Sequence, residues 1–282
     1  MLVSAPASSA NLGPGFDCLG LALDLPFRVG VGGTAAGADL LPAEPGHPVV
    51  EAYLAAEGRP GVELGWRSPI PPGRGLGFSG AARVAGAYLA ARQGGRDHHA
   101  ARQVAFTVAA DLEGHPDNAA ASAYGGFVVA VEDRVERLSV PVGVRVVVWW
   151  PSDTTSTDRS RRQLPDTVHL TDAAFNIGRT ALWVAAMARG DLGALRRACE
   201  DRLHQRARLA DREDSARTLE RSLADPAVLG AWLSGSGPSI ATLVQSDHAE
   251  SVARTLADGG GRVRVVDIAV DGVGETTDRI LT

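Results

Sequence analysis

The sequence predicts an α+β fold, and three observations support this prediction. Short apolar runs typical of β-strands are mixed with longer segments in which apolar residues recur every three or four positions, as they do in helices. The two kinds of segment do not alternate strictly, whereas a doubly wound parallel sheet needs such alternation. With 282 residues, the chain is long enough for one large domain or two closely packed ones.

The elements are expected from local patterns along the chain. Runs of β-type residues predict strands at residues 2–5, 27–31, 61–66, 125–131 and 143–150. Helical periodicity predicts helices at residues 80–92, 99–112, 172–188, 192–208 and 215–223. Proline and glycine are concentrated at residues 33–48 and 68–77, which predicts loops.

A change of composition indicates where the chain divides. Between residues 140 and 153, glycine-rich turns give way to arginine-rich helices. We therefore expect two domains, covering residues 1–145 and 146–282.

Composition also limits the partners and the compartment. The net charge of −5 gives no general attraction to nucleic acids or anionic membranes. The N-terminus does not resemble a secretory signal, and the densest apolar runs are far shorter than the ~20 residues of a spanning helix. Cys18 and Cys199 form no paired motif, and the histidines show no zinc-ligand spacing. We expect a cytoplasmic protein with two free thiols and no structural zinc.

The segment GRGLGFSGAARVAG, residues 73–86, is typical of a phosphate-binding loop. Glycines at 73, 75 and 77 allow several N–H groups to point one way. Together with the positive end of the helix that follows, these groups would make an anion site that needs no ammonium group. Ser79 is expected to cap a helix that starts at Gly80, and its hydroxyl could also reach a magnesium ion. The alternative is a tight turn before a buried alanine-rich helix. It is not a Walker motif, since no lysine follows, and all 28 basic residues of the chain are arginine.

A second candidate segment is SAPASSANLGPGFDCLGLALD, residues 4–24. Asn11, Gly13, Gly15 and Asp17 are expected in a turn between a strand and an apolar stretch, where an amide and a carboxylate could face a small polar ligand. The alternative is that these residues are simply good turn formers.

The third segment, LEGHPDNAAASAYGG at residues 112–126, places polar groups next to a run of small residues. Glu113, His115, Asp117 and Asn118 could be presented to a ligand at a helix start, although Asp117 could equally be only an N-cap. If Asp111 and Glu113 are helical, they lie ~200° apart around the axis, so only one of them can face a given site.

A late glycine loop, LSGSGPS at residues 233–239, offers another close approach of backbone to a ligand. In their order and spacing, these four segments resemble the motifs of the GHMP small-molecule kinase superfamily and, within it, of the homoserine kinases. The first is similar to PATSANLGPGFD, and PPGRGLGFSGAA is similar to GRGLGSSAA. EGHPDN, YGGF and LSGSGP also match.

Two further matches are specific to the homoserine kinase branch. STDRSRRQLP at 156–165 is similar to a pattern ST…AR..LP, and DRLHQRAR at 201–208 is similar to DRLHQPYR. The resemblance covers about residues 2–245. Relatives of mevalonate kinase carry a lysine in the first segment and the homoserine kinase pattern has none, so the lysine-free chain fits this branch.

The resemblance implies a fold and an activity. It implies an N-terminal α+β domain that resembles a ribosomal-protein domain and binds ATP, and a C-terminal ferredoxin-like domain, with both substrates in the cleft between them. It also implies direct in-line transfer of the γ-phosphoryl group of MgATP to L-homoserine, which gives O-phospho-L-homoserine for threonine synthesis. The implied partners are ATP, Mg²⁺, L-homoserine and a second copy of the chain.

The resemblance also implies roles for individual residues. Glu113 and Ser79 would hold magnesium, with Asp111 as the alternative acid, and Asn118 would orient the attacking hydroxyl. The phosphates would be bound by Pro72, Gly73, Arg74, Gly75, Leu76, Gly77, Phe78, Ser79 and Gly80.

In the implied substrate pocket, Arg161 and Arg208 bind the carboxylate, because a guanidinium can hold a carboxylate through two parallel bonds. Asp17 holds the ammonium group. The pocket is completed by Asn11, His115, Thr157 and Gly235. The neighbouring arginines are expected on a solvated basic face; these are Arg159, Arg162 and Arg206. Asp117 is expected to cap or to hydrogen-bond rather than to act as a base.

This sequence departs from the family pattern at the phosphate loop. Phe78 stands where the pattern has serine, and Gly80 where it has alanine. The Phe78 ring either weakens nucleotide binding or turns into the core. His47 is expected to replace an asparagine that relatives place near adenine. We expect an active kinase with altered nucleotide contacts; the alternatives are another GHMP kinase or a silent paralogue that only binds ligand.

Overall fold

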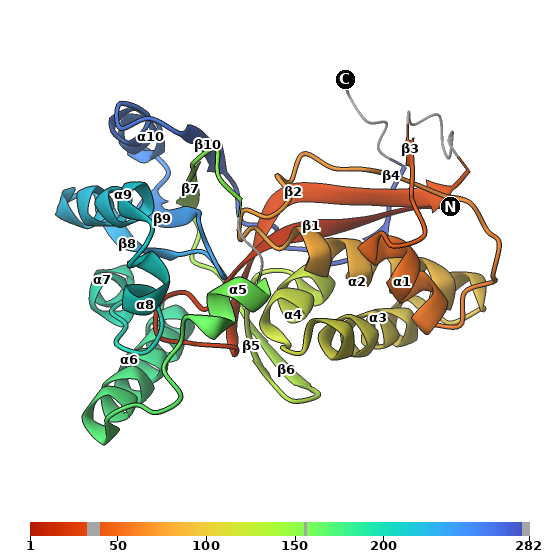
Figure 1. Cartoon of the computed structure of the whole chain (residues 1–282), viewed down its shortest axis with the longest axis horizontal. Helices are drawn as coiled ribbons and strands as arrows, with labels where there is room; N and C mark the ends of the chain where they lie inside the picture. The colour runs from red at the N-terminus through yellow and green to blue at the C-terminus, as the bar shows by residue number, and fades with distance from the viewer. Residues whose placement is uncertain (33–39, 155–156, 278–282) are drawn as a thin grey trace.

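The computed structural model describes residues 1–32, 40–154 and 157–277, with the backbone alone at 157 and 158. Two β-sheets and their helices form the two sides of the molecule (Figure 1). The observed mixture of helices with antiparallel sheets confirms the predicted α+β class.

The first sheet has seven strands, all paired antiparallel. Its main path runs β11-β1-β2-β4-β3, and β5 pairs with both β2 and β6. The bounds are β1 Leu2–Ala10, β2 Leu19–Val31, β3 Leu41–Pro42, β4 Leu64–Arg67, β5 Phe127–Val131, β6 Arg134–Leu138 and β11 Gly274–Glu275. Ala10 pairs with Gly20, so β1 and β2 bring together the two ends of the turn at residues 11–18.

Helices α2 and α4 pack against this sheet, and α1 and α3 pack against these two helices (Figure 1). Their bounds are α1 Pro48–Ala55, α2 Phe78–Gln93, α3 His98–Glu113 and α4 Asp117–Tyr124. The alanine-rich α2 lies in the middle and is buried on most sides, because its small side chains let its neighbours approach closely. At Gly86 an added Cβ would lie 2.2 Å from the carbonyl oxygen of Val49 in α1.

The second sheet has four strands in the order β10-β7-β9-β8, with helices α9 and α10 packed against it. The bounds are β7 Val144–Trp150, α9 Glu213–Ala224, β8 Val228–Leu233, β9 Ile240–Gln245, α10 Ala249–Ala257 and β10 Arg262–Val266. This order, with one helix before β8 and one after β9, is the ferredoxin-like arrangement that the resemblance implies.

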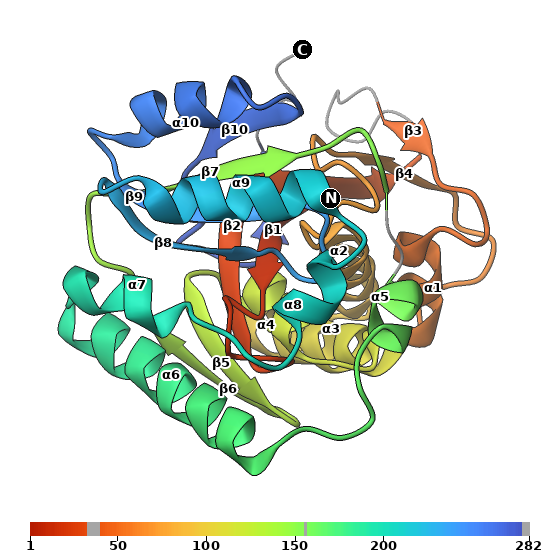
Figure 2. The ribbon, with the colours of Figure 1, turned by 60° about the vertical axis from the view of Figure 1, so that its left-hand side comes forward.

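Several short helices and one long helix connect β7 to α9. Their bounds are α5 Thr157–Arg162, α6 Leu170–Arg189, α7 Leu195–Ala198 and α8 Gln205–Leu209, with a 3₁₀ turn, η2, at Leu192–Ala194. Figure 2 shows α6 along the lower edge of the molecule, beside β5 and β6. Trp183 of α6 stacks on Phe127 of β5, with ring centroids 5.6 Å apart.

The expected helix at residues 192–208 is wrong. The chain leaves the helical path after Ala198 and resumes it at Gln205. The reason is Asp201, whose carboxylate accepts hydrogen bonds from the backbone N–H groups of Leu203, His204 and Gln205 at 3.1, 3.0 and 2.7 Å. A side chain that satisfies backbone donors in this way replaces the helical bonds.

Other element predictions need smaller changes. The first strand extends to Ala10, and α2 begins two residues before the expected Gly80. The expected loop at 33–48 contains β3, and its residues 33–39 lie outside the described part of the chain. The first sheet gives way to the second at β7, while β11 returns to the first sheet near the end of the chain. The division at residue 145 stays a prediction.

In the described ranges, no helix is both long enough and apolar enough to span a bilayer.

Candidate active site

The two glycine loops meet the ends of α3 and α4 around a cavity of about 260 Å³. The first loop provides Gly73, Arg74, Gly75, Gly77, Phe78 and Ser79. The remaining lining residues are Glu113, Asn118, Gly235, Ser236 and Gly237. The third and fourth sequence segments therefore reach the same cavity as the phosphate-type loop.

The glycines of the first loop are required by geometry. Gly73, Gly75 and Gly77 have φ values of 64°, 72° and 67°, a region that other residues rarely adopt. A Cβ at Gly75 would lie 2.3 Å from the carbonyl oxygen of Ser234, and one at Gly77 would lie 2.0 Å from the hydroxyl of Ser8. The loop is thus packed tightly against β1 and the second glycine loop.

Ser79 does not cap the helix as expected. Gly77 occupies the N-cap position, and its carbonyl oxygen accepts the hydrogen bond from Ala81 N–H at 2.9 Å. Ser79 therefore lies in the first turn of α2 and lines the cavity. The first N–H groups of a helix have no partner within it, so this end of α2 offers donors and a positive potential to an anion.

At the end of α3, only one of the two acids that the sequence left as alternatives lines the cavity. Glu113 lines the cavity and Asp111 is exposed away from it. The Glu113 carboxylate accepts a hydrogen bond from Arg83 of α2, which also bonds Glu51 at 3.2 Å. This position favours Glu113 over Asp111 as an acid at the site.

Asn118 is held in place by its neighbours. Its Oδ1 accepts a hydrogen bond from the hydroxyl of Ser8 at 2.9 Å, and its backbone N–H donates to Asp117 Oδ1 at 2.8 Å. Asp117 is buried, begins α4, and also bonds His115 Nδ1 at 2.7 Å. Pro116, rather than Asp117, is the N-cap of α4. Gly80 lies against Asn118, since an added Cβ would be 3.2 Å from the Cβ of Asn118.

His115 has an electrostatic environment that favours its charged form. Burial alone would lower the pKa of the imidazole, but the hydrogen bond to Asp117 and the charges of Asp117 and Glu113 outweigh it, so the pKa is raised. Asp17, His115 and Asp117 each offer a ligand atom, and these atoms lie within 4.8 Å of one another. The three residues therefore form one polar cluster.

The turn at residues 11–18 supplies Asp17 to this cluster and contacts the late glycine loop. Asn11 Nδ2 donates to the carbonyl oxygen of Gly235 at 3.0 Å, and Asn11 Oδ1 accepts from Asp17 N–H at 3.0 Å. Asp17 has a φ of 57°, which aspartate tolerates better than most residues. Its two carboxylate oxygens accept hydrogen bonds from Arg161 at 3.0 and 2.8 Å.

Arg208, unlike Arg161, is almost fully buried. Only 2% of the residue is exposed, and its Nη1 donates to the carbonyl oxygen of Gly235 at 3.1 Å. Within the described ranges it has no carboxylate partner, and its Nε has no hydrogen-bond acceptor. Burial, reinforced by the charge of Arg161, lowers the pKa of Arg208 to about 10.

Phe16 and His204 shape the space around this guanidinium. The Phe16 ring centroid lies 5.2 Å from the guanidinium carbon of Arg208 and 5.5 Å from that of Arg161. His204 is buried, and its Nε2 bonds the carbonyl oxygen of Gly13 at 2.7 Å. A carbonyl only accepts, so Nε2 carries the proton and Nδ1 accepts from Arg208 at 3.3 Å. Burial lowers the pKa of His204, which keeps this neutral form.

The Phe78 ring packs into a group of aromatic side chains. It lies edge-on to Phe27, Trp66 and His47, with ring centroids 5.6, 5.5 and 5.8 Å away. His47 caps α1, where its Nδ1 accepts from Val49 N–H at 3.2 Å, and burial lowers the pKa of its imidazole. Because Phe78 also lines the cavity, this aromatic group forms part of its surroundings.

The predicted site residues thus divide into four groups, of which the first, described above, lines the cavity. The structure places Asn11, Asp17, His115, Arg161, Arg208 and Gly235 around the polar cluster, beside the glycine loops. Pro72, Leu76 and Gly80 support the loop without lining the cavity, and the side chain of Thr157 lies outside the described part of the chain. Arg162 and Arg206 are exposed, as expected for a solvated basic face.

Sequence reasoning missed residues that hold the predicted ones. They are Ser8, Phe16, Arg83 and His204. Ser8, Phe16 and His204 lie inside the recognised segments, so their position in those segments was the available signal. Arg83 lies four residues after Ser79 on α2, a spacing that places both on one side of a helix.

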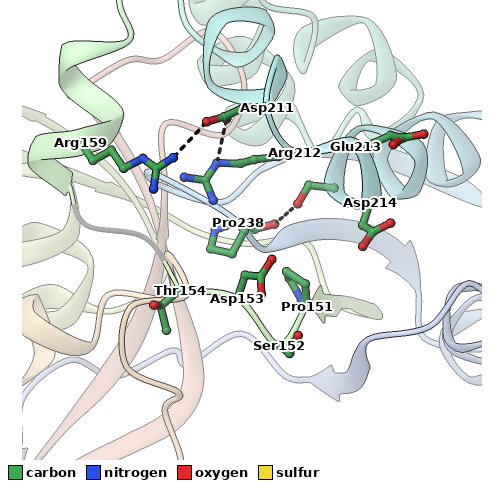
Figure 3. Close-up of a pocket in the computed structure, with 11 residues that line it drawn as sticks. Pro151, Ser152, Asp153, Thr154, Arg159, Asp211, Arg212, Glu213, Asp214 and Pro238 are labelled. Carbon is green, nitrogen blue, oxygen red and sulfur yellow. Dashed lines mark hydrogen bonds and ion pairs between the residues drawn. The ribbon is translucent and has the colours of Figure 1, made fainter.

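A larger cavity lies elsewhere. It measures about 690 Å³ and lies between the end of β7, α5 and the start of α9 (Figure 3). Its lining includes more acidic than basic residues: Asp153, Asp211, Glu213 and Asp214 against Arg159 and Arg212. Arg159 bonds Asp211 at 3.3 Å, as Figure 3 shows. None of the predicted site residues lines this cavity, and its acidic wall is unsuited to phosphates.

Comparison with known proteins defines the class first. Family models for the GHMP kinases N terminal domain and the GHMP kinases C terminal match residues 47–126 and 183–261. The chain is a GHMP kinase. It is also 42% identical to the homoserine kinase of Thermus thermophilus over 266 residues, 89% of each chain, and 38% identical to that of Streptomyces avermitilis over 91% of this chain and 90% of the relative. The chain belongs to the homoserine kinase family.

Solved structures agree with this family. The homoserine kinase from Cytophaga hutchinsonii superposes with a TM-score of 0.82 at 26% identity, covering 97% of this chain and 96% of that one. A putative homoserine kinase from Listeria monocytogenes has a TM-score of 0.77 at 27% identity, covering 97% and 98%. A mevalonate kinase has a TM-score of 0.66 at 11% identity over 95% and 99% of the two chains, which shows a shared fold alone.

Proposed function

We propose that this protein transfers the γ-phosphoryl group of ATP to the side-chain hydroxyl of L-homoserine, giving ADP and O-phospho-L-homoserine for threonine synthesis. The observation that carries the choice of substrate is the buried Arg208, which has no carboxylate partner in the described chain and lies beside Asp17. A buried cation without an anion calls for an anionic group on the ligand. The homoserine kinases among its relatives support the same substrate.

The glycine loop from Pro72 to Gly80 is the proposed phosphate site. Its backbone curls at three positive-φ glycines and enters the N-terminus of α2, so its N–H groups and the helix end can receive phosphate oxygens. Arg74 donates to the carbonyl oxygen of Pro151 at 3.2 Å, which ties the loop to the end of β7. His47 is the proposed neighbour of the adenine, next to Phe78.

Mg²⁺ fits the oxygen donors at the cavity. Ser79 and Glu113 both line it, and hydroxyl and carboxylate oxygens are ligands that this ion prefers. When bound with ATP, the ion neutralises charge on the transferring phosphates. Glu113 would share its carboxylate between the ion and Arg83.

Asn118 is the proposed residue that orients the attacking hydroxyl. Ser8 and Asp117 fix its side chain and backbone, so it can hold a substrate oxygen in line with the phosphorus atom. Asp117 already accepts hydrogen bonds from His115 and Asn118, which supports a positioning role rather than that of a general base. Phosphoryl transfer depends mostly on such positioning and on charge stabilisation.

The polar cluster is the proposed amino-acid site. Arg208, with Arg161, binds the carboxylate of homoserine, and Asp17 binds its ammonium group. Asn11, His115, Thr157 and Gly235 complete the pocket. The contact between Asn11 and Gly235 supports this grouping, because it joins the first segment to the late glycine loop.

Three further properties are proposed with the function. The domains are residues 1–145, which carry the ATP site, and 146–282, which carry the substrate loop. The protein works as a homodimer. It acts in the cytoplasm, where two free cysteines such as Cys18 and Cys199 stay reduced.

The test is ADP release by the purified protein with MgATP and, separately, L-homoserine, L-serine, mevalonate or shikimate. Turnover confined to homoserine is expected. Turnover with mevalonate or shikimate instead would assign the protein to another GHMP kinase activity. No turnover with any of them, together with measurable homoserine binding, would point to a silent ligand-binding paralogue.

A further inference from the structure

The proposed amino-acid site already contains an ion pair. Arg161 donates to both carboxylate oxygens of Asp17, at 3.0 and 2.8 Å, across 144 residues of sequence. These are the two side chains assigned to the opposite charges of the substrate. They therefore satisfy each other in the structure, in the geometry in which a guanidinium binds a carboxylate best.

Arg208 stands beside this pair and takes no part in it. Its Nη1 donates to the carbonyl oxygen of Gly235, its Nε has no acceptor, and the charge of Arg161 acts against its own. Both guanidinium groups lie over the ring of Phe16. The two arginines and Asp17 thus form a group with one cation in excess, and the unmatched cation is the more buried one.

We propose that Arg161 is a specificity-determining residue. It stays paired with the Asp17 carboxylate until a substrate bearing both charges displaces it from that carboxylate. The substrate carboxylate first pairs with Arg208. The substrate ammonium group then takes over Asp17, and the released Arg161 turns to the same carboxylate. This inference rests on the proposed function and explains why the site would reject a ligand that bears only an ammonium group.

The reason is the number of charges left without a partner. A ligand with both charges keeps the single excess cation, because Asp17 holds the ammonium group and the two arginines share one carboxylate. A ligand with only a carboxylate leaves no charge unmatched, because the pair of Asp17 and Arg161 stays closed and the ligand pairs with Arg208. A ligand with only an ammonium group takes Asp17 and leaves two neighbouring guanidinium groups unmatched, which is costly in a partly buried site.

Two fragments of the substrate test this asymmetry. 4-Hydroxybutyrate lacks the ammonium group of homoserine, and 3-amino-1-propanol lacks its carboxylate. Calorimetric titration is expected to show binding of homoserine, weaker binding of 4-hydroxybutyrate, and 3-amino-1-propanol at least about tenfold weaker again, a difference of about 1.4 kcal/mol.

Variants give opposite shifts for the two fragments. Arg161→Gln removes both the competitor for Asp17 and a nearby like charge, so binding of 3-amino-1-propanol is expected to tighten by about tenfold. Asp17→Asn releases Arg161, so 4-hydroxybutyrate is expected to bind more tightly. Arg159→Gln is the matched control, because this arginine of the same helix pairs with Asp211 instead (Figure 3). It should leave the order of the three ligands unchanged.

The proposal fails if wild-type protein binds 3-amino-1-propanol as tightly as 4-hydroxybutyrate, or if Arg161→Gln weakens both fragments alike. The second result would mean that Arg161 only holds the carboxylate. Should Arg161→Gln not fold, Asp17→Asn decides, since unchanged or weaker binding of 4-hydroxybutyrate also overturns the proposal. ADP release with homoserine, measured on the same wild-type preparation, tests the proposed function separately from the fragments.

Discussion

At the scale of single residues, Arg208 shows how a site can be prepared for a ligand at the expense of stability. Its guanidinium is removed from water, and among the described residues no acid forms an ion pair with it. Such a charge is unfavourable in the folded protein until an anion arrives. The residue that is proposed to bind the substrate carboxylate is therefore expected to destabilise the free protein.

This conflict gives a prediction for Arg208→Met, in which a long apolar side chain replaces the guanidinium at similar volume. The free protein is expected to be more stable, by about 1 kcal/mol, because the buried unpaired charge is gone. The KM for homoserine should rise by about a hundredfold, since a charged hydrogen bond worth roughly 2–3 kcal/mol is lost. Denaturant unfolding and steady-state kinetics measure the two effects.

Arg206→Met is the control, because Arg206 lies on the same short helix with its side chain exposed. It should change neither the free energy of unfolding nor the KM appreciably. A loss of stability in Arg208→Met, with an unchanged KM, would show that Arg208 has a structural role and does not bind the substrate.

At the scale of elements, the turn between α7 and α8 decides where Arg208 points. Asp201 holds this turn through three backbone N–H groups and through Asn176, whose Nδ2 donates to it at 2.7 Å. His204 then reaches Gly13, which joins the turn to the loop at residues 11–18. The carboxylate therefore acts on the site through the backbone, at a distance from the substrate.

Asp201→Ala is expected to destabilise the protein by about 1–3 kcal/mol, because buried backbone donors lose their acceptor. Activity should fall mainly through a higher KM for homoserine, since α8 and Arg208 lose their fixed direction. The KM for ATP should stay close to the wild-type value, because no hydrogen bond among the described residues joins the first glycine loop, residues 73–79, to this turn. Equal changes in both KM values would contradict this separation.

Local patterns predicted some of the elements and the residues of the recognised motifs, but they missed β6, β8, β9, β10 and α1. They could not predict the break after Ala198, because residues 192–208 have good helix formers throughout and the competing acceptor is one aspartate in their middle. They also could not predict contacts such as Asn11 to Gly235 or Asp17 to Arg161, which join segments 224 and 144 residues apart. Only the packing of the two sheets brings these partners together.

At the scale of the whole molecule, residues of the two sheets meet in one large hydrophobic core, while a second, smaller core joins the second sheet to α10. Trp183 stacks on Phe127 of the first sheet and lies edge-on to Trp232 of the second, with centroids 5.6 and 5.8 Å away. Trp232 Nε1 also donates to the hydroxyl of Ser9 in β1 at 2.9 Å. Residues of both predicted domains therefore depend on each other for burial.

The end of the described chain strengthens this dependence. Gly274 and Glu275 pair with β1, Ile268 forms a bridge to Leu23, and Val273 N–H donates to the carbonyl oxygen of Ala123 at 3.2 Å. An unpaired edge strand exposes a row of hydrogen-bonding groups that promotes aggregation. The C-terminal segment covers such an edge on β1, so the N-terminal sheet is completed by residues from the other end of the sequence.

The whole chain is therefore expected to unfold in a single calorimetric transition, and the fragment 1–145 is expected not to unfold cooperatively by itself. The fragment lacks both the cover of β1 and the tryptophans that bury Phe127, so it exposes apolar surface worth about 25 cal/mol per Å². Fusing residues 264–277 to the fragment through a glycine-serine linker restores the edge pairing but not the tryptophan packing, and should recover only part of the ordered structure by circular dichroism. A fragment 1–145 that melts cooperatively near the transition of the full chain would instead show that the boundary at 145 separates two independent folding units.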